Sequence, residues 1–277
     1  HGGCGLVTGQ HMDLGAGGLD ENALAYLEGG AADELTCQAN LQVWQEWALL
    51  PRMLRELRGG HTRCRLLGQE LQHPILLAPV AYQQLFHAEG ELATAMAAGV
   101  MGGAAVLSSF ASTSLEAVAE VAQGPLWFQL YWQGDGDRTL ALAERAAAAG
   151  YQALVLTVDA PVSGLRNREQ RAGFKLPEGI RAVNVDESPR LPELQPGQSP
   201  VFDGLLALAP RWEEVAWLCR HSPLPVLLKG ILHPADARQA MQAGAAGVIA
   251  SDHGGRVLDS QLPAVKMLPA IRQAVGD

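Results

Sequence analysis

The sequence predicts an α/β fold, a TIM (β/α)8 barrel of which only about six βα units are present in this chain. Apolar runs of strand length alternate with Ala-, Leu- and Glu-rich stretches of helical spacing, which indicates βα units on a parallel sheet. Polar residues follow the ends of these runs along the whole chain, as in a barrel. An open doubly wound sheet would alternate in the same way, but no G-x-G-x-x-G motif follows the first expected strand.

The expected strands are short and rich in Leu, Val, Ile and Ala. Runs of this type are typical of strands that are buried on both faces of a parallel sheet. They cover residues 75–78, 104–107, 126–130, 153–158, 226–228 and 247–250. A closed barrel of this type has eight strands, so we expect an incomplete barrel whose remaining units are cut away or supplied elsewhere.

The expected helices precede or separate these strands. They cover residues 20–28, 32–47, 89–100, 114–122, 139–149, 212–219 and 234–243. Asp20 is the predicted N-cap of the first helix, and Thr113 with Glu116 is the predicted capping box of the fourth. Gly150 and Gly244 stand where two of the helices are expected to end.

One barrel domain over residues 13–277 is the simplest division of the chain. Residues 1–12 are Gly-rich and end in His-Met, so we expect them to be extraneous to the fold. The connection over residues 160–210 breaks the βα rhythm and is partly rich in Pro, Ser and Gly. We therefore expect a loop or lid near the site there.

Composition limits the class of partner. The formal net charge is −9 and no run of Lys or Arg is present, which argues against nucleic acid. No apolar stretch approaches the roughly 20 residues of a membrane span. The four cysteines are far apart with no C-x-x-C pair, so neither a metal site nor a disulfide framework is expected. We expect a soluble, cytoplasmic protein.

The stretch from Ser251 to Asp259 contains the most concentrated chemistry in the chain. It follows the last expected strand, and in a barrel that end of a strand faces the mouth where ligands bind. His253 is a candidate base, Arg256 is a candidate anion holder, and the two glycines between them let the backbone approach a ligand closely. Taken alone, a structural histidine explains this stretch equally well.

Further candidates stand at or just beyond the other strand ends. They are Pro79, Val80, Ala81, Ser108, Gln129, Tyr131, Thr157, Asp159 and Lys229. Arg166 and Arg256 are suited to clamp a carboxylate bidentately. His253 is suited to remove a hydroxyl proton, with Asp159 stabilising the imidazolium that results. Lys229 is suited to hold negative charge that develops on a cofactor or an enolate.

A series of motifs runs in one order from about Ala25 to Asp277. They are Tyr26 with Gly30-Ala31, Pro51-Arg52-Met53-Leu54, Ala78-Pro79-Val80-Ala81, Glu89-Gly90-Glu91, Leu107-Ser108-Ser109, Gln129-Leu130-Tyr131, Thr157-Val158-Asp159, Lys229-Gly230 and His253-Gly254-Gly255-Arg256. Together they resemble the FMN-dependent α-hydroxy acid oxidase and dehydrogenase family, which includes glycolate oxidase, lactate oxidase and mandelate dehydrogenase. The resemblance is nearest to members of the hydroxymandelate oxidase type.

The resemblance implies an FMN site at the strand ends. The residues that would contact the flavin are Pro79, Val80, Ala81, Ser108, Gln129, Thr157, Lys229 and Ser251. The first three would lie against the ring through their backbone, and the next three would hydrogen-bond its polar edge. Lys229 would stabilise the anionic reduced ring near its N1/O2 end.

The resemblance also implies a substrate site. Tyr26, Tyr131, Arg166, His253 and Arg256 would bind the substrate, and His253, Asp159, Tyr131 and Arg256 would carry the catalysis. The implied reaction is oxidation of an L-2-hydroxy acid to the 2-oxo acid, with oxygen or another electron acceptor. The stretch of residues 78–92 favours a mandelate-like or other bulky acid, and relatives often form homo-tetramers.

Two other classes of function stay open on the sequence. Lys229 is also placed as the Schiff-base lysine of an aldolase-type barrel would be. A non-catalytic, incomplete barrel is the second alternative. Ser108 and Thr157 would then be ordinary strand-end caps, and Arg166 would be a solvated surface residue.

The sequence departs from the family pattern at three places. Asp252 stands where the family usually has Asn, so we expect a raised pKa at His253 or altered hydrogen bonds around it. Phe110 stands where Trp is common, which bears on the shape of the substrate pocket. The family's later Asp-Gly-Gly and Gly-Arg segments, which bind the FMN phosphate, do not occur in this sequence.

Overall fold

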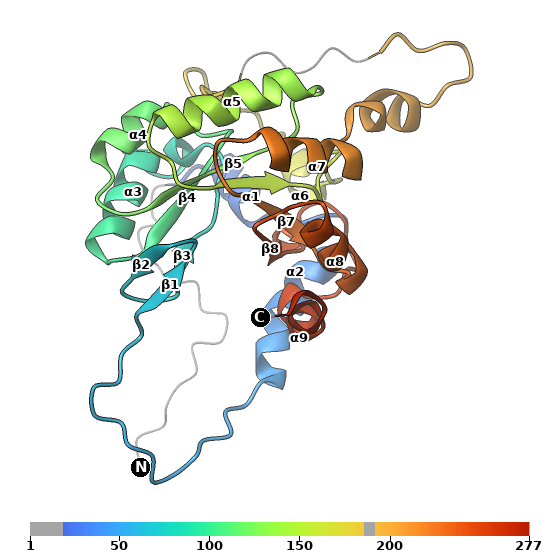
Figure 1. Cartoon of the computed structure of the whole chain (residues 1–277). Helices are drawn as coiled ribbons and strands as arrows, with labels where there is room; N and C mark the ends of the chain where they lie inside the picture. Colours follow the sequence, from blue (N-terminus) through green and yellow to red (C-terminus); the bar gives the residue numbers. More distant parts are fainter. Residues whose placement is uncertain (1–18, 186–191, 277) are drawn as a thin grey trace.

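The protein is described by a computed structural model over residues 19–185 and 192–276. Six parallel strands form one curved sheet in chain order, and helices cover its outer face (Figure 1). The strands are β3 (Leu76–Leu77), β4 (Ala104–Ser108), β5 (Leu126–Leu130), β6 (Leu154–Thr157), β7 (Val226–Ile231) and β8 (Gly247–Ala250). All six were predicted, which confirms the incomplete barrel. The predicted extraneous residues 1–12 lie outside the described residues.

Helices follow the predicted order, with bounds that differ by a few residues. They are α1 (Glu21–Glu28), α2 (Leu35–Gln42), α3 (Gly90–Val100), α4 (Leu115–Val121), α5 (Gly136–Ala148), α7 (Trp212–His221) and α8 (Pro234–Gln242). Four elements were not predicted: the antiparallel hairpin β1 (Cys64–Leu66) and β2 (Gln69–Leu71), α6 (Asn167–Ala172) and α9 (Ala264–Val275). No helix in the described part of the chain is both long enough and apolar enough to cross a bilayer.

Alternation along the strands separates two apolar layers. One set of side chains, including Leu107, Phe128 and Leu156, packs against the outer helices. The side chains that alternate with these along the strands point into the barrel. They form a second cluster of Val106, Trp127, Ala153, Val155 and Leu227. Because successive strand residues face opposite sides, the residue two positions after each interior apolar residue also faces the interior.

The predicted helix over residues 32–47 is shorter than expected. Ala32 and Glu34 have left-handed backbones, with φ of 45° and 62°, and such residues interrupt a helix. The turn is held by tertiary contacts, because the Ala32 N–H donates to the Leu165 carbonyl at 2.7 Å. The chain therefore turns sharply here and α2 begins only at Leu35, followed by a 3-10 turn at Val43–Glu46.

The predicted capping box of Thr113 and Glu116 is wrong. Ser114 is the N-cap of α4, and its hydroxyl accepts from the Ala117 N–H at 3.3 Å. Thr113 donates its hydroxyl to Glu91, and Glu116 pairs with Arg145 at 2.7 Å. Both predicted partners are thus taken by residues far away in the sequence.

The predicted loop over residues 160–210 contains regular structure. Besides α6, it includes a π-helical turn at Pro200–Leu205 and a 3-10 turn at Leu206–Leu208. Helix α6 matters most for the site, because it packs beside α1 and carries charged residues toward the barrel mouth. Residues 186–191 of this connection lie outside the described residues.

Candidate functional site

The interior face of the sheet changes from apolar to polar at the carboxyl ends of its strands. Ser108, Gln129, Thr157 and Lys229 each follow an interior apolar residue by two positions and lie directly above that layer. The Ser108 hydroxyl donates to Gln129 Oε1 at 3.2 Å, and Gln129 Nε2 donates to the Thr157 hydroxyl at 3.0 Å. This chain of buried hydrogen bonds crosses three adjacent strands, so the predicted residues form one polar strip.

Lys229 continues the polar strip on β7, where it pairs with Thr157 in the strand register. Burial lowers the pKa of its ammonium, and the nearby carboxylates of Asp159 and Asp252 oppose this shift. Within the described part of the chain, the ammonium has no hydrogen bond or salt bridge. A partly buried cation of this kind is available to a ligand that carries negative charge.

Residues 79–81 lie at the same end of the sheet, beyond the short strand β3. Leu77 stands opposite Ala105 in the register, which brings the Pro79 to Ala81 backbone beside the end of β4. The Val80 side chain is 41% exposed. The backbone of this stretch therefore borders the polar strip.

His253 sits in a 3-10 turn directly after β8. Its Nδ1 lies 2.8 Å from Asp159 Oδ1, and its Nε2 lies 3.5 Å from the Tyr131 hydroxyl. The residue has a left-handed backbone with φ of 57°, and the Ser251 hydroxyl accepts from its N–H at 3.0 Å. Three strand ends, those of β5, β6 and β8, thus bring an imidazole, a carboxylate and a phenol together.

The contact between Asp159 and His253 depends on Gly230. A Cβ at Gly230 would lie 2.4 Å from Asp159 Cγ, and the backbone has φ of +106°. Neither feature is compatible with a side chain. Gly230 therefore lets the Asp159 carboxylate pack directly against β7.

Arg166 and Arg256 share one carboxylate, that of Glu169. Arg166 Nε and Arg256 Nη2 each lie 3.2 Å from Glu169 Oε1. Burial raises the pKa of Glu169, and the two arginines oppose that shift. Burial lowers the pKa of Arg256, and the charge of Arg166 lowers it further. Glu169 therefore holds together two guanidinium groups that would otherwise repel each other.

The two arginines differ in how many of their guanidinium nitrogens already have partners within the protein. Arg256 Nη1 donates to the Tyr26 carbonyl at 2.8 Å and to the Gly29 carbonyl. Arg166 makes its ion pair through Nε, and neither of its terminal nitrogens donates a hydrogen bond within the described part of the chain. Both guanidinium groups lie over the Tyr26 ring, at 5.9 Å for Arg166 and 5.1 Å for Arg256.

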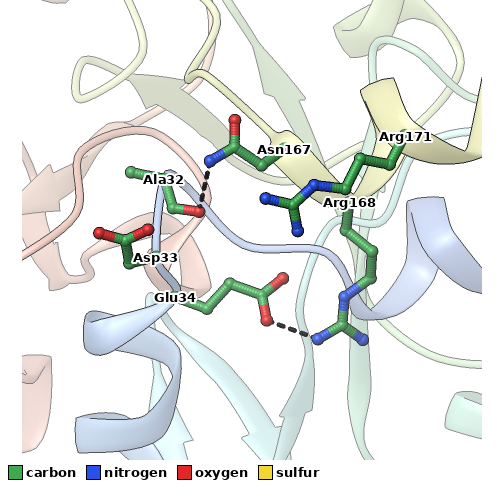
Figure 2. Close-up of a pocket in the computed structure, with 6 residues that line it drawn as sticks. All are labelled: Ala32, Asp33, Glu34, Asn167, Arg168 and Arg171. Carbon is green, nitrogen blue, oxygen red and sulfur yellow. Dashed lines mark hydrogen bonds and ion pairs between the residues drawn. The ribbon is translucent and has the colours of Figure 1, made fainter.

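Helix α6, which carries Glu169, is fixed to the turn between α1 and α2. Figure 2 shows this junction around a surface pocket of about 270 Å³. Asn167 Nδ2 donates to the Ala32 carbonyl at 3.0 Å, and Arg168 pairs with Glu34 and with Glu28. These contacts of Asn167 and Arg168 anchor α6 to the turn between α1 and α2.

Six aromatic side chains form a continuous surface beside His253, which we call the aromatic wall. They are Tyr26, Tyr82, Phe86, Phe110, Tyr131 and Phe174. Tyr26 stacks on Phe174 with ring centroids 4.8 Å apart, and Phe110 lies 5.2 Å from Tyr131. Burial raises the pKa of Tyr131 to about 12, and Asp159 adds to this shift. The Tyr131 hydroxyl is therefore protonated at neutral pH.

Comparison with known proteins gives the family. The family model described as FMN-dependent dehydrogenase matches residues 16–277. The chain belongs to the FMN-dependent dehydrogenase family. This confirms the predicted resemblance and identifies the protein as an FMN-dependent flavoprotein oxidoreductase of the 2-hydroxy acid oxidase type. The aldolase-type interpretation of Lys229 is not supported by this result.

Individual members of the family are similar in sequence to this protein over most of its length. An L-lactate oxidase of Alicycliphilus denitrificans is 45% identical over 93% of this chain and 71% of its own length. A 4-hydroxymandelate oxidase of Amycolatopsis orientalis is 44% identical over 91% of this chain and 71% of its own length. A crystal structure of mandelate oxidase with benzoyl-formic acid has a TM-score of 0.83 at 41% identity, covering 93% of this chain and 71% of that chain.

The residues at the strand ends fit the FMN of this family. A flavin has an apolar ring with a polar edge, and the polar strip lies directly above an apolar layer. Two buried oxygens, Ser109 Oγ and Asp159 Oδ2, have no hydrogen-bond partner among the described residues. Buried polar atoms without partners are rare and usually indicate a bound group or water. The unpartnered Asp159 Oδ2 and the Lys229 ammonium, which has no hydrogen bond or salt bridge among the described residues, make this edge of the sheet suitable for a flavin.

Sequence reasoning missed three residues in and around the site of this family member. Glu169 stands three positions after Arg166, a spacing typical of a helical ion pair, but the segment was expected to be a loop. No sequence pattern around Phe174 indicated a role in the site, apart from its aromatic side chain. Glu91 resembles a solvent-facing acid at the start of a helix, although it is only 1% exposed.

Asp252 lies in the turn that carries His253, and its predicted effect on His253 stays a prediction. Its buried carboxylate accepts from Asn40 Nδ2 at 2.9 Å and from the N–H groups of Gly255 and Ala264, each at 3.1 Å. These bonds join α2 and α9 to the turn that carries His253. Asp252 therefore places a buried carboxylate where the turn that carries His253 is held in place.

Replacing Gly230 with alanine is expected to lower the free energy of unfolding by about 2–4 kcal/mol, because the Cβ clashes with Asp159 and φ is unfavourable. Gly150→Ala is the matched control, since Gly150 has φ of +92° but no atom within 4 Å of the added Cβ. We expect the control to lose about 1–2 kcal/mol. Urea unfolding of both variants measures the difference, and equal losses would contradict the packing role of Gly230.

Proposed function

We propose that this enzyme oxidises an L-2-hydroxy acid with an aromatic or other bulky side chain to the corresponding 2-oxo acid. Oxygen or another carrier then reoxidises the flavin. The proposal rests chiefly on the His253 imidazole, which has Asp159 at 2.8 Å from one ring nitrogen and the Tyr131 hydroxyl at 3.5 Å from the other. This arrangement suits a general base whose outer nitrogen faces the substrate.

His253 acts as the base in this proposal. The Asp159 carboxylate accepts a hydrogen bond from Nδ1–H, which leaves the Nε2 lone pair free to take the hydroxyl proton of the substrate. Asp159 then stabilises the imidazolium that has formed. FMN, when bound, would supply the two-electron acceptor that the oxidation needs. The part of the protein's own residues in this step is to hold the hydroxyl proton at His253 Nε2.

The substrate carboxylate binds at the two arginines. The terminal nitrogens of Arg166 are free to form a bidentate pair, and Arg256 adds positive charge through the remainder of its guanidinium. The hydroxyls of Tyr26 and Tyr131 complete this set of donors. Glu169 keeps Arg166 and Arg256 at a fixed separation, each 3.2 Å from its Oε1.

The aromatic wall favours an aryl substrate. An aromatic side chain gains from packing against other rings at centroid distances such as the 5.2 and 6.3 Å seen here. The 4-hydroxymandelate oxidase and the mandelate oxidase bound to benzoyl-formic acid are relatives with aryl ligands. The L-lactate oxidase, at 45% identity, makes a small acid the alternative.

The polar strip and the residues around it hold the flavin in this proposal. Ser108, Gln129 and Thr157 would hydrogen-bond the polar edge of the flavin, and the backbone of residues 79–81 would border it. Lys229 would supply positive charge that stabilises negative charge on the flavin, and Ser251 would border the same site.

Anaerobic bleaching of the flavin tests this function. The FMN-loaded protein is mixed with (S)-mandelate or with L-lactate, and the loss of the visible flavin absorbance is followed over time. We expect both acids to bleach the band, with a higher kcat/KM for mandelate because its ring contacts the aromatic wall. Faster reduction by lactate would overturn the aryl assignment. No bleaching by any 2-hydroxy acid would favour a barrel that binds ligands without catalysis.

A further inference from the structure

Glu91, in the first turn of α3, is a buried carboxylate that the proposed reaction does not use. Its Oε1 accepts from the backbone N–H of Gln83 at 3.0 Å and from that of Ser112 at 2.9 Å. Its Oε2 accepts from the hydroxyls of Ser112 and Thr113, each at 2.9 Å. The residue is 1% exposed and, among the described residues, forms no salt bridge. Neutral donors alone compensate this buried charge.

The two segments joined by Glu91 carry two members of the aromatic wall. Gln83 follows Tyr82 in the turn after β3, and Ser112 follows Phe110 in the loop after β4. The segments also bond to each other, since the Tyr82 N–H donates to the Phe110 carbonyl at 3.1 Å and the Gln84 N–H to the Ser112 hydroxyl at 3.2 Å. Glu91 lies at the centre of this connection.

Tyr82 needs such support because its backbone is strained. Its φ is 52°, in the left-handed region that bulky residues rarely adopt. A strained residue persists only where surrounding contacts determine its position. The N–H of Tyr82 itself donates to the Phe110 carbonyl, and the next N–H along the chain, that of Gln83, donates to Glu91. Without that acceptor, the turn is free to relax and move the Tyr82 ring.

The rings of Tyr82 and Phe110 are linked through Tyr131 to the proposed base, His253. Tyr82 and Phe110 are stacked at 6.3 Å with an interplanar angle of 11°, and Phe110 lies 5.2 Å from Tyr131. Tyr131 in turn has its hydroxyl 3.5 Å from His253 Nε2. A shift of the Tyr82 turn would therefore change the space open to a substrate side chain beside the base.

We propose that Glu91 is a positioning residue that fixes the aromatic wall and so sets the ratio of kcat/KM between aryl and small 2-hydroxy acids. This inference rests on the proposed function, because it assumes that the wall faces the substrate. It assigns no chemical step to Glu91. The carboxylate acts only through Tyr82 and Phe110.

Glu91→Met and Glu91→Gln form the test pair. Methionine has similar length but leaves the N–H groups of Gln83 and Ser112 without an acceptor. Glutamine keeps one oxygen for both N–H groups, and its Nε2 donates to the hydroxyls of Ser112 and Thr113, which can rotate to accept. We expect the mandelate-to-lactate ratio of kcat/KM to fall at least about tenfold in the methionine variant, mainly through KM for mandelate. The glutamine variant should stay within about threefold of the wild-type ratio.

Glu89→Met is the matched control, because Glu89 is exposed at the start of the same helix. It should leave the ratio unchanged. If Glu91→Met fails to fold, Ser112→Ala provides a milder variant, since it removes the hydroxyl that joins Gln84 to Glu91. We expect the mandelate-to-lactate ratio of kcat/KM to fall in Ser112→Ala as well, but by less than in Glu91→Met.

A second measurement separates this inference from the proposed function. The affinities for benzoylformate and pyruvate are measured from the change in flavin absorbance, without turnover. Selective loss of benzoylformate affinity in Glu91→Met supports the inference. An equal loss for both acids, or an unchanged ratio in the folded variant, would overturn it. Failure of the proposed function would appear separately, as a wild-type protein that no 2-hydroxy acid reduces.

Discussion

Replacing His253 with glutamine is expected to lower kcat by at least about a hundredfold, the usual scale for loss of a general base. Glutamine keeps a polar side chain in the turn but has no group that takes up a proton at neutral pH. The Tyr131 hydroxyl and Asp159 remain in place, so substrate binding should change far less than turnover. Single-turnover reduction of the flavin by mandelate measures this effect directly.

The His253→Gln variant should still bind FMN, because the polar strip and Lys229 are distant in sequence and are untouched by the change. Its visible absorption spectrum checks this. His221→Gln is a matched control, since His221 is exposed on α7 and, among the described residues, its ring contacts only Trp217 in its own helix, through a hydrogen bond to the carbonyl and by stacking. Turnover of His253→Gln at the wild-type rate would remove the imidazole from the mechanism.

The strands and much of the proposed site could be predicted because both follow from short, continuous apolar runs in the sequence. Buried strands are apolar on both faces, so they stand out as short runs of Val, Leu and Ile. The first polar residues after these runs, such as Gln129 and Lys229, are then confined to one end of the sheet. Parallel strands bring those ends together whatever the length of chain between them.

Helix α6 could not be predicted because its stability does not come from its own sequence. The segment Asn167–Ala172 is short and mostly polar, so it has no apolar stripe. It is held by the bond from Asn167 to the Ala32 carbonyl and by the ion pairs of Arg168. These partners are more than a hundred residues away in the chain. Glu169 was missed for the same reason.

The wrong prediction of a capping box at the start of α4 has the opposite cause. Thr113 and Glu116 have the spacing of a capping box, and the local pattern is correct. Glu91 and Arg145, however, lie close enough in the fold to bind these two side chains. Charged partners form stronger hydrogen bonds than a helix terminus does. Long-range charge therefore displaced a local preference, and Ser114 became the cap.

Replacing Arg166 with methionine is expected to lower kcat/KM by about 30-fold to a few thousandfold. Removing one member of a hydrogen-bonded charge pair costs about 2–5 kcal/mol, and each 1.4 kcal/mol is a factor of about ten. Because the terminal nitrogens of Arg166 have no partner within the described residues, they are the donors that a substrate carboxylate would use. Steady-state kinetics with mandelate measure the loss.

Arg256→Met provides the comparison that identifies the main carboxylate ligand. Arg256 also donates to the carbonyls of Tyr26 and Gly29, so this variant should lose stability as well as activity. Arg166→Met leaves the ends of α1 and α6 joined and should unfold at nearly the wild-type urea concentration. Arg166→Lys keeps the charge without the planar fork, so it should recover only part of kcat/KM. If Arg166→Met kept wild-type kcat/KM while Arg256→Met lost it, the carboxylate would bind to Arg256 alone.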